Sequence, residues 1–194
     1  MGRIVAVEYI SLDGVVQGPG HAEEDREGGF DRGGWSAPWF SEHGRLIPSR
    51  FRAADAFLFG RLTYDIWAVH WPGVTEPHDE VAQALNTRPK YVVSTTLTDP
   101  SWAGTTVING DLSKEIPAVR DAHDRDIVTM GSAQLAQALI EHDLVDRYEL
   151  WVHPVVVGGG KRLFGDQVPA FRLTLADATT TPSGLAILGY ERAT

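Results

Sequence analysis

The chain has 194 residues and no cysteine, so it can bury a full hydrophobic core but cannot form disulfide bonds, thiolate nucleophiles or cysteine-ligated metal sites. Its formal net charge is −9, from 17 basic and 26 acidic residues, which argues against general nucleic-acid binding because that function requires a basic face. We therefore expect no nucleic-acid partner and no metal, although a few local groups could still hold an anionic small molecule.

The chain carries no apparent targeting or membrane signal. The first residues hold only a short apolar run without the layout of a signal peptide, and no stretch approaches the ~20 apolar residues that span a bilayer. Together with the absence of cysteine, these features fit a reducing compartment, and we expect a cytoplasmic protein that does not contact membranes.

Predicted strands and helices alternate through most of the chain. Apolar, β-branched runs predict strands at 3–10, 55–59, 90–96, 105–109 and 126–131. Amphipathic spacing predicts helices at 38–51, 61–71, 78–86, 113–123 and 133–143. Pro48 is expected to end or kink the first of these helices, and Ser113 to cap the fourth. The segment 21–35 has no period and predicts a long loop.

The last third of the chain changes pattern. Three further strands are predicted at 147–157, 171–181 and 185–192, with no helical pattern between them. Alternating strands and helices favour a mostly parallel sheet with helices on both faces, and the trailing strands favour an antiparallel addition at one edge. No repeat or linker divides the chain, so we expect a single α/β domain over residues 1–194.

Ligands of an open α/β sheet bind beyond the carboxyl ends of its strands, and the first junction of interest there is 60–63. Gly60 allows the backbone to turn, Arg61 places a cation at the start of a helix, and Thr63 adds a hydroxyl beside the free amides of the first turn. Together these groups suit a phosphate.

Two other junctions have the same character. Ser94 and Thr95 end a strand with hydroxyl groups, while Gly131 permits close backbone approach and Ser132 can cap the next helix. Any one of these junctions, taken alone, is also an ordinary way for a helix to begin after a strand. Because three such junctions occur in one sheet, a nucleotide site is as good an interpretation as three ordinary helix starts, although the GxGxxG dinucleotide pattern is absent.

Two loops are ambiguous. Asp13, in "SLDG", can shape an Asp-Gly turn or hydrogen-bond a ribose or substrate. The run 158–160 is three glycines followed by Lys161 and Arg162. It fails the phosphate-loop pattern, which needs glycine at position 155 and Ser or Thr at 162. We interpret the glycines as a sharp turn near another backbone, with room for a pocket wall, and the two cations as surface charges.

Taken together, these segments resemble a known family. The chain is similar to dihydrofolate-reductase-fold proteins, and more closely to proteins like the C-terminal reductase domain of the riboflavin-biosynthesis deaminase-reductase (RibD). The segments that carry the resemblance are "SLDGVVQGPG", "FGRLTYDIWAVHWP", "KYVVSTTL", "GSAQLAQALIEHDLVDRYELWVHPVVVGGGKRLFG" and "GLAILGYER". They follow the family's order and cover nearly the whole chain.

The resemblance implies a three-layer α/β/α fold that binds NADPH and commonly forms a homodimer. It places Asp13 near the nicotinamide ribose and the substrate. The cofactor-binding residues that it implies are Gly60, Arg61 and Thr63 at the phosphates, Ser94 and Thr95 near the adenosine half, and Gly131, Ser132, Gln134 and Leu135 around the pyrophosphate and nicotinamide.

The chain departs from the family in two ways. The zinc deaminase domain is absent, since its motif needs cysteine, so we expect a stand-alone reductase-like domain. In dihydrofolate reductases an acid on the first long helix binds the pterin. The nearest acid here is Glu42, with His43 beside it, and Glu42 fits a solvated helix position better than a catalytic one. Basic residues for a ribitol phosphate are not clearly placed.

The implied reaction is hydride transfer from NADPH to a C=N or C=O group of a small pterin-, pyrimidine- or imine-like heterocycle. This would make the chain similar to 5-amino-6-(5-phosphoribosylamino)uracil reductase or to dihydrofolate reductase. The candidate proton donors or orienting groups are Asp13, Glu42, His43 and Tyr64. A protein of the same fold that binds nucleotide without turnover, as a sensor or interaction module, is the alternative.

The aromatic residues near the long loop allow two interpretations. Trp35, Trp39, Phe40 and Trp67 could stack on a flat substrate, or could simply pack around the loop and helix. His153, in an apolar strand, fits a structural histidine better than a catalytic one.

Overall fold

The computed structural model describes residues 1–166 and 168–193, and the strands in these ranges form one eight-stranded sheet. Its order is β4-β3-β2-β5-β1-β6-β8-β7, parallel from β4 to β6 and antiparallel at β8 and β7. The strands are β1 (Arg3–Ser11), β2 (Ala54–Gly60), β3 (Lys90–Val93), β4 (Thr105–Ile108), β5 (Asp126–Met130), β6 (Arg147–His153), β7 (Leu173–Thr180) and β8 (Ala186–Arg192).

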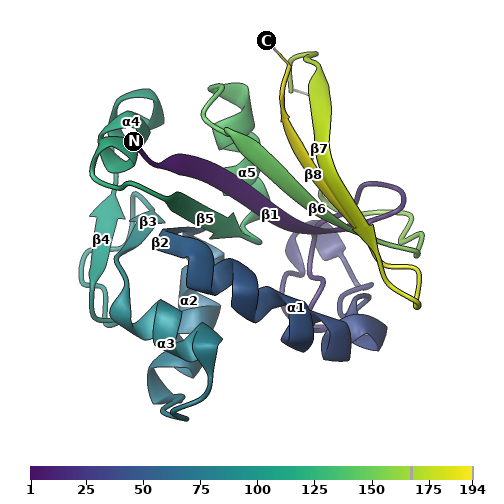
Figure 1. Cartoon of the computed structure of the whole chain (residues 1–194), viewed down its shortest axis with the longest axis horizontal. Helices are drawn as coiled ribbons and strands as arrows, with labels where there is room; N and C mark the ends of the chain where they lie inside the picture. Colours follow the sequence, from purple (N-terminus) through teal and green to yellow (C-terminus); the bar gives the residue numbers. More distant parts are fainter. Residues whose placement is uncertain (167, 194) are drawn as a thin grey trace.

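Helices cover both faces of this sheet, as Figure 1 shows. They are α1 (Phe40–Ala53), α2 (Arg61–His70), α3 (Glu80–Thr87), α4 (Leu112–Asp121) and α5 (Ala133–Glu141), with short 3₁₀ turns at Glu27–Gly29, Ala37–Trp39 and Trp71–Gly73. One core cluster packs α4 and α5 on the sheet through residues such as Ile116 and Leu139. The other packs α1, α2 and α3 on the opposite face through Phe51, Tyr64 and Leu85. The predicted three-layer, mostly parallel fold with antiparallel C-terminal strands is therefore confirmed.

Several element ends differ from the sequence prediction, and three of these differences have a clear physical reason. α1 continues through Pro48 to Ala53, because Ile47 and Phe51 are buried against the sheet and hold the helix together. α4 begins at Leu112, capped by Asp111 rather than Ser113. β6 ends at His153, since Pro154 has no amide proton to continue the ladder.

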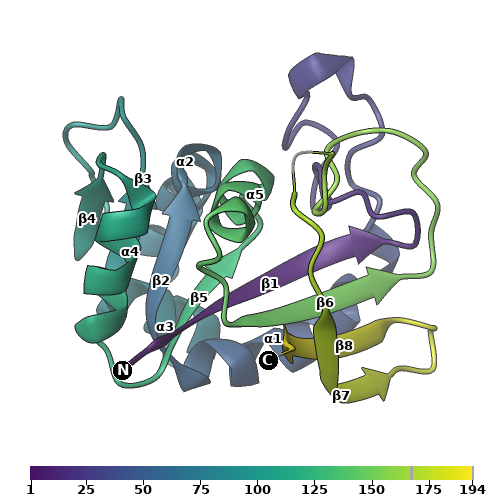
Figure 2. The ribbon, with the colours of Figure 1, turned by 90° about the horizontal axis from the view of Figure 1, so that it is seen from above.

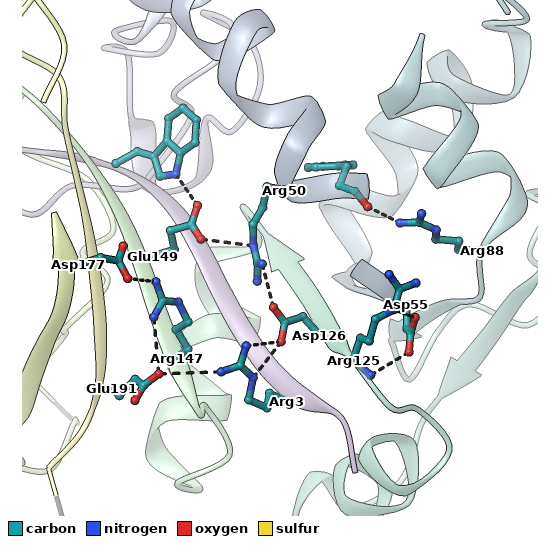
Figure 3. Close-up of polar contacts among 12 residues, drawn as sticks. Arg3, Arg50, Asp55, Arg88, Arg125, Asp126, Arg147, Glu149, Asp177 and Glu191 are labelled. Carbon is teal, nitrogen blue, oxygen red and sulfur yellow. Dashed lines mark hydrogen bonds and ion pairs between the residues drawn. The ribbon is translucent and has the colours of Figure 1, made fainter. Parts of the chain in front are cut away.

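Charged side chains gather at the amino ends of the central strands (Figure 3). Asp126, the first residue of β5, pairs with Arg3 of β1 and Arg50 of α1, each at 2.8 Å. Arg50 also pairs with Glu149 of β6 at 3.3 Å. Because Asp126 and Arg50 are largely buried, this network ties α1 to three neighbouring strands.

The carboxyl ends of β1 and β6 lead into two long loops that lie side by side (Figure 2). The Val16 amide donates to the Lys161 carbonyl at 2.9 Å, and the Leu163 amide donates to the Gly14 carbonyl at 3.2 Å. No helix in the described part of the chain is long and apolar enough to cross a membrane.

Candidate active site

Two of the predicted junctions meet because β2 and β5 are parallel neighbours. The Gly60 amide donates to Ser132 Oγ at 2.9 Å, and Ser132 Oγ donates to Thr63 Oγ1 at 2.7 Å. Gly131 has φ of 66°, a conformation that favours glycine, and a Cβ there would lie 3.5 Å from Thr63 Oγ1. The backbone turns of the two junctions are thus locked together by one serine.

Both helices that start at these junctions leave their first amides uncapped by a side chain. α2 begins after Gly60 and α5 after Ser132, and neither residue makes a side-chain capping bond. By contrast, α3 and α4 are capped by Asp79 and Asp111. Free amides at a helix N-terminus attract anions, so the two uncapped ends are available to a phosphate-bearing ligand.

A cavity of about 720 Å³ lies over these helix ends. Seven of the nine residues predicted to bind the cofactor line it: Gly60, Arg61, Thr63, Gly131, Ser132, Gln134 and Leu135. Ser94 and Thr95 are not among its lining residues. Ser94 Oγ instead accepts from the amides of Thr96 and Leu97, and Thr95 is exposed.

Arg61 reaches from its own junction towards the third one. Its Nε donates to the Asp65 carboxylate at 2.8 Å, and its Nη1 donates to Thr96 Oγ1 at 3.2 Å. The side chain remains partly exposed at the cavity edge. Arg61 is therefore placed where a phosphate at the adenosine end of a dinucleotide could meet it.

The loop after β1 closes one side of the cavity. Lys161 Nζ pairs with Asp25 at 2.7 Å and with Glu27 at 2.6 Å, and Gln134 Nε2 donates to Glu27 at 3.2 Å. Lys161 also lines the cavity and is mostly buried, so the prediction that it is a surface charge is wrong. Its two acidic partners hold it against the loop.

A second cavity of about 530 Å³ adjoins the first and has aromatic walls. Its wall includes Tyr9, Phe51, Trp67 and Trp71. The two cavities share the lining residues Pro19, Glu24, Thr63, Ile66 and Gly131. A ligand in one cavity can therefore contact a ligand in the other across the Gly131 junction.

Glu8 is an acidic residue in the wall of this aromatic cavity, and sequence reasoning missed it. Its side chain is 1% exposed, and Oε1 has no hydrogen-bond partner among the described residues. Burial raises the pKa of Glu8 well above its ordinary value, because desolvation disfavours the carboxylate. The available signal was a single acid inside the apolar run of β1. A buried acid without a partner destabilises a fold, so its presence there calls for another reason.

Comparisons with known proteins show the family to which the chain belongs. Residues 3–187 match the family model described as the RibD C-terminal domain. This chain belongs to that family. The "Uncharacterized protein YyaP" of Bacillus subtilis is 30% identical over 139 residues, covering 71% of this chain and 73% of that protein. Membership of the RibD C-terminal domain family supports a reductase-type function.

Solved structures share the fold at low identity. A "Putative riboflavin biosynthesis protein" from Shewanella sp. PV-4 superposes with a TM-score of 0.66 at 18% identity, covering 99% of each chain. A pyrimidine reductase-like protein from Corynebacterium diphtheriae gives a TM-score of 0.66 at 16% identity, covering 99% of this chain and 92% of that one. At such identities the likeness establishes the fold of this RibD C-terminal domain.

The two acids and the phenol predicted as catalytic, Asp13, Glu42 and Tyr64, do not gather around one cavity. Asp13 accepts from the amides of Val157 and Gly158 at 2.9 and 2.8 Å, which lowers its pKa to about 2. Asp13 thus holds the start of the triple-glycine loop, where Gly158 and Gly160 have positive φ. This agrees with the structural interpretation of the glycines, and a catalytic role for Asp13 stays a prediction.

Glu42 and Tyr64 also have partners outside both cavities. Glu42 Oε2 accepts from the hydroxyls of Thr181 and Ser183 at 2.8 Å, and these bonds hold its pKa below the ordinary value. Tyr64 is buried, and its hydroxyl accepts from the Trp102 amide at 3.2 Å. Neither residue is among the described residues that line these two cavities of the RibD C-terminal domain, and their catalytic roles stay predictions.

Of the four predicted stacking residues, Trp67 lines the aromatic cavity, whereas Trp35, Trp39 and Phe40 do not. Trp35 and Trp39 each pack edge-on against His153 with ring centroids 5.3 Å apart. Phe40 is 43% exposed. Trp35 and Trp39 therefore contribute to packing around the loop, as one of the two interpretations expects.

A pair of buried histidines separates this packing from the aromatic cavity. His43 Nε2 lies 2.9 Å from His153 Nε2, and His43 also stacks on Tyr9. Burial lowers the pKa of His43 to about 4, with a further contribution from His153, so the His43 ring is neutral near pH 7. His153 is completely buried, in agreement with its predicted structural role.

Proposed function

We propose that this chain is an NADPH-dependent reductase acting on a small heterocycle. The observation that carries the proposal is the convergence of two uncapped helix ends, α2 and α5, on a cavity that opens into an aromatic one. Free helix amides suit the phosphates of a dinucleotide, and aromatic walls suit a flat substrate. The homodimer implied by the resemblance and the cytoplasmic location expected from the composition stay predictions.

The residues of the larger cavity fit a dinucleotide. The amides at the starts of α2 and α5 would hold the pyrophosphate, with Thr63 and Ser132 fixing the two turns. Arg61 would meet a phosphate of the adenosine half, and Ser94 and Thr95 lie one strand further along. Gln134 and Leu135 would flank the nicotinamide side. A bound nicotinamide cofactor supplies the hydride.

Glu8 is the group that we propose as the proton source. Reduction of a C=N bond needs a proton on nitrogen after the hydride reaches carbon. Glu8 lies in the wall of the substrate cavity, and its burial favours the protonated acid that such a step requires. The hydrophobic surroundings of Glu8 favour its protonated form, whereas a cationic partner would favour the carboxylate.

Titration of tryptophan fluorescence with NADPH and NADH tests the cofactor assignment. We expect Arg61→Ala to weaken NADPH binding about 10- to 100-fold and NADH binding far less, because a charge-assisted contact to the 2′-phosphate is lost. Arg52→Ala is the matched control, since Arg52 pairs only with Glu80 at the surface among the ion pairs of the described residues. If neither NADPH nor NADH binds, the proposal is contradicted. Binding without turnover favours a sensor or interaction module instead.

A further inference from the structure

The two adjoining cavities differ in the cationic side chains that line them. The cofactor cavity is lined by three cations, Arg26, Arg61 and Lys161, together with four acids, Glu23, Glu24, Asp25 and Glu27. The described residues that line the aromatic cavity include no lysine or arginine at all, and they include two acids, Glu8 and Glu24. An anion therefore finds cationic side chains in the first cavity and none in the second.

The remaining titratable groups of the aromatic cavity do not replace the missing cations. His43 is buried and neutral, with its Nε2 turned to His153. His21 and His70 are exposed, so water screens them. Tyr9 is an uncharged phenol at neutral pH, because its burial raises an already high pKa.

Glu24 adds a barrier at the boundary between the cavities. It lines both of them, and its Oε2 accepts from the amides of Gly20 at 2.5 Å and His21 at 3.1 Å. These bonds fix a carboxylate beside the shared wall. A phosphate or carboxylate on a substrate would lie near this like charge, without a cation to offset its loss of water.

The walls favour flat and electron-poor groups instead. Tyr9, Phe51, Trp67 and Trp71 surround a volume of about 530 Å³, which suits a ligand of one or two rings. Aromatic faces stack on heterocycles and attract cations through their quadrupoles. A protonated imine gains from both these faces and the nearby carboxylate.

We propose that the aromatic cavity binds a one- or two-ring C=N heterocycle that is neutral or cationic, and that it rejects substrates carrying a phosphate or carboxylate. This inference rests on the proposed reductase function. A neutral imine would take a hydride from NADPH at carbon and a proton at nitrogen, whereas an already protonated imine would need the hydride alone; both give an amine and NADP⁺. A phosphorylated ribosylaminouracil is thereby excluded as the substrate of this chain.

The test compares two probes that differ by one anionic group, 3,4-dihydroisoquinoline and 3,4-dihydroisoquinoline-3-carboxylate. Quenching of tryptophan fluorescence measures their binding to the NADP⁺ complex. We expect the carboxylate to bind at least about tenfold more weakly. Equal or tighter binding of the carboxylate overturns the proposal, and so does a failure of both probes to bind.

A charge introduced into the cavity wall sharpens this test. Val81 lines the cavity and is only partly buried, so Val81→Lys adds a cation with little disturbance of the fold. We expect Val81→Lys to reduce the difference between the probes to about threefold or less, and the uncharged control Val81→Met to preserve it. An unchanged difference in Val81→Lys contradicts the role of charge.

The result is separable from the proposed function. NADPH titration of the same preparation reports the cofactor site without the probes. If NADPH fails to bind, the reductase proposal fails. If NADPH binds and the carboxylate probe binds as well as the imine, only the substrate inference fails.

Discussion

Asp126 and Glu8 are buried acids on neighbouring parallel strands, but they lie at opposite ends of the sheet and have opposite surroundings. Asp126, at the amino end of β5, is held by two arginines at 2.8 Å. Glu8, near the carboxyl end of β1, has an oxygen without a partner among the described residues and lies in a cavity wall. One acid is satisfied by the fold, and the other is the acid that we propose to act on a ligand.

This difference follows from the topology. At the amino ends, α1 returns across the strands and brings Arg50 onto Asp126 and Glu149. At the carboxyl ends, the chain departs into helices on either face, so neighbouring strands separate and leave cavities. Charge at the first end stabilises the fold, whereas polarity at the second end serves binding in the function that we propose.

The largest effect is expected for Glu8→Gln. Turnover should fall by about 100-fold or more because the proposed proton source is lost, while NADPH affinity and the urea midpoint stay the same or improve. The turnover of the unmutated protein should fall as pH rises through the elevated pKa of Glu8, and the variant should lack this limb. Steady-state kinetics across pH measures both.

Glu42→Gln is the control for that substitution, because Glu42 bonds Thr181 and Ser183 outside the cavities. Its turnover should stay within about threefold of the unmutated protein. A larger loss for Glu42→Gln than for Glu8→Gln would reverse the assignment and restore the acid predicted from the sequence.

Asp126→Ala should affect stability rather than binding. Its removal leaves Arg50 buried beside one remaining partner, Glu149, and we expect the free energy of unfolding to fall by about 3 kcal/mol. Urea denaturation measures the change. Glu80→Ala, which breaks an exposed pair with Arg52, should cost less than about 1 kcal/mol. Equal losses for the two variants would show that burial of the network is unimportant.

A smaller effect is expected from the histidine pair. Below about pH 6.5 the unfolded chain binds a proton that folded His43 accepts only near pH 4, so the free energy of unfolding falls as pH decreases through this window. Between about pH 7.5 and pH 5, we expect His43 to account for a loss of about 2 kcal/mol.

Urea midpoints of His43→Gln at the two pH values measure that contribution. The variant should lose less stability on acidification than the unmutated protein. His78→Gln, at an exposed position, should behave like the unmutated protein. The same acid sensitivity in His43→Gln would assign the effect to other groups, His153 first among them.

Local patterns in the sequence predicted the fold well because they record which faces are buried. The apolar run in 3–10 and the periodicity in 133–143 correspond to β1 and α5. Pro48 misled the prediction, because the burial of Ile47 and Phe51 outweighs one missing hydrogen bond in α1. Asp111 was overlooked as a cap because Ser113, two positions later, carries the same preference.

The candidate site was only partly predictable for a different reason. Gly60, Thr63, Gly131 and Ser132 were found because turns and helix starts leave local signals. Glu8 leaves only a weaker signal, a single acid inside an apolar run, because its importance depends on what lies around it in the folded chain.

The sequence by itself determined the order of the elements, the absence of thiol chemistry and the two turns that lead into α2 and α5, because each depends on residues close together in the chain. Only the tertiary structure decided which polar groups have partners. It bonds Asp13 to the glycine loop, Glu42 to Thr181 and Lys161 to Asp25, and leaves Glu8 in a cavity wall. Burial and pairing involve residues more than a hundred positions apart, so local pattern carries no record of them.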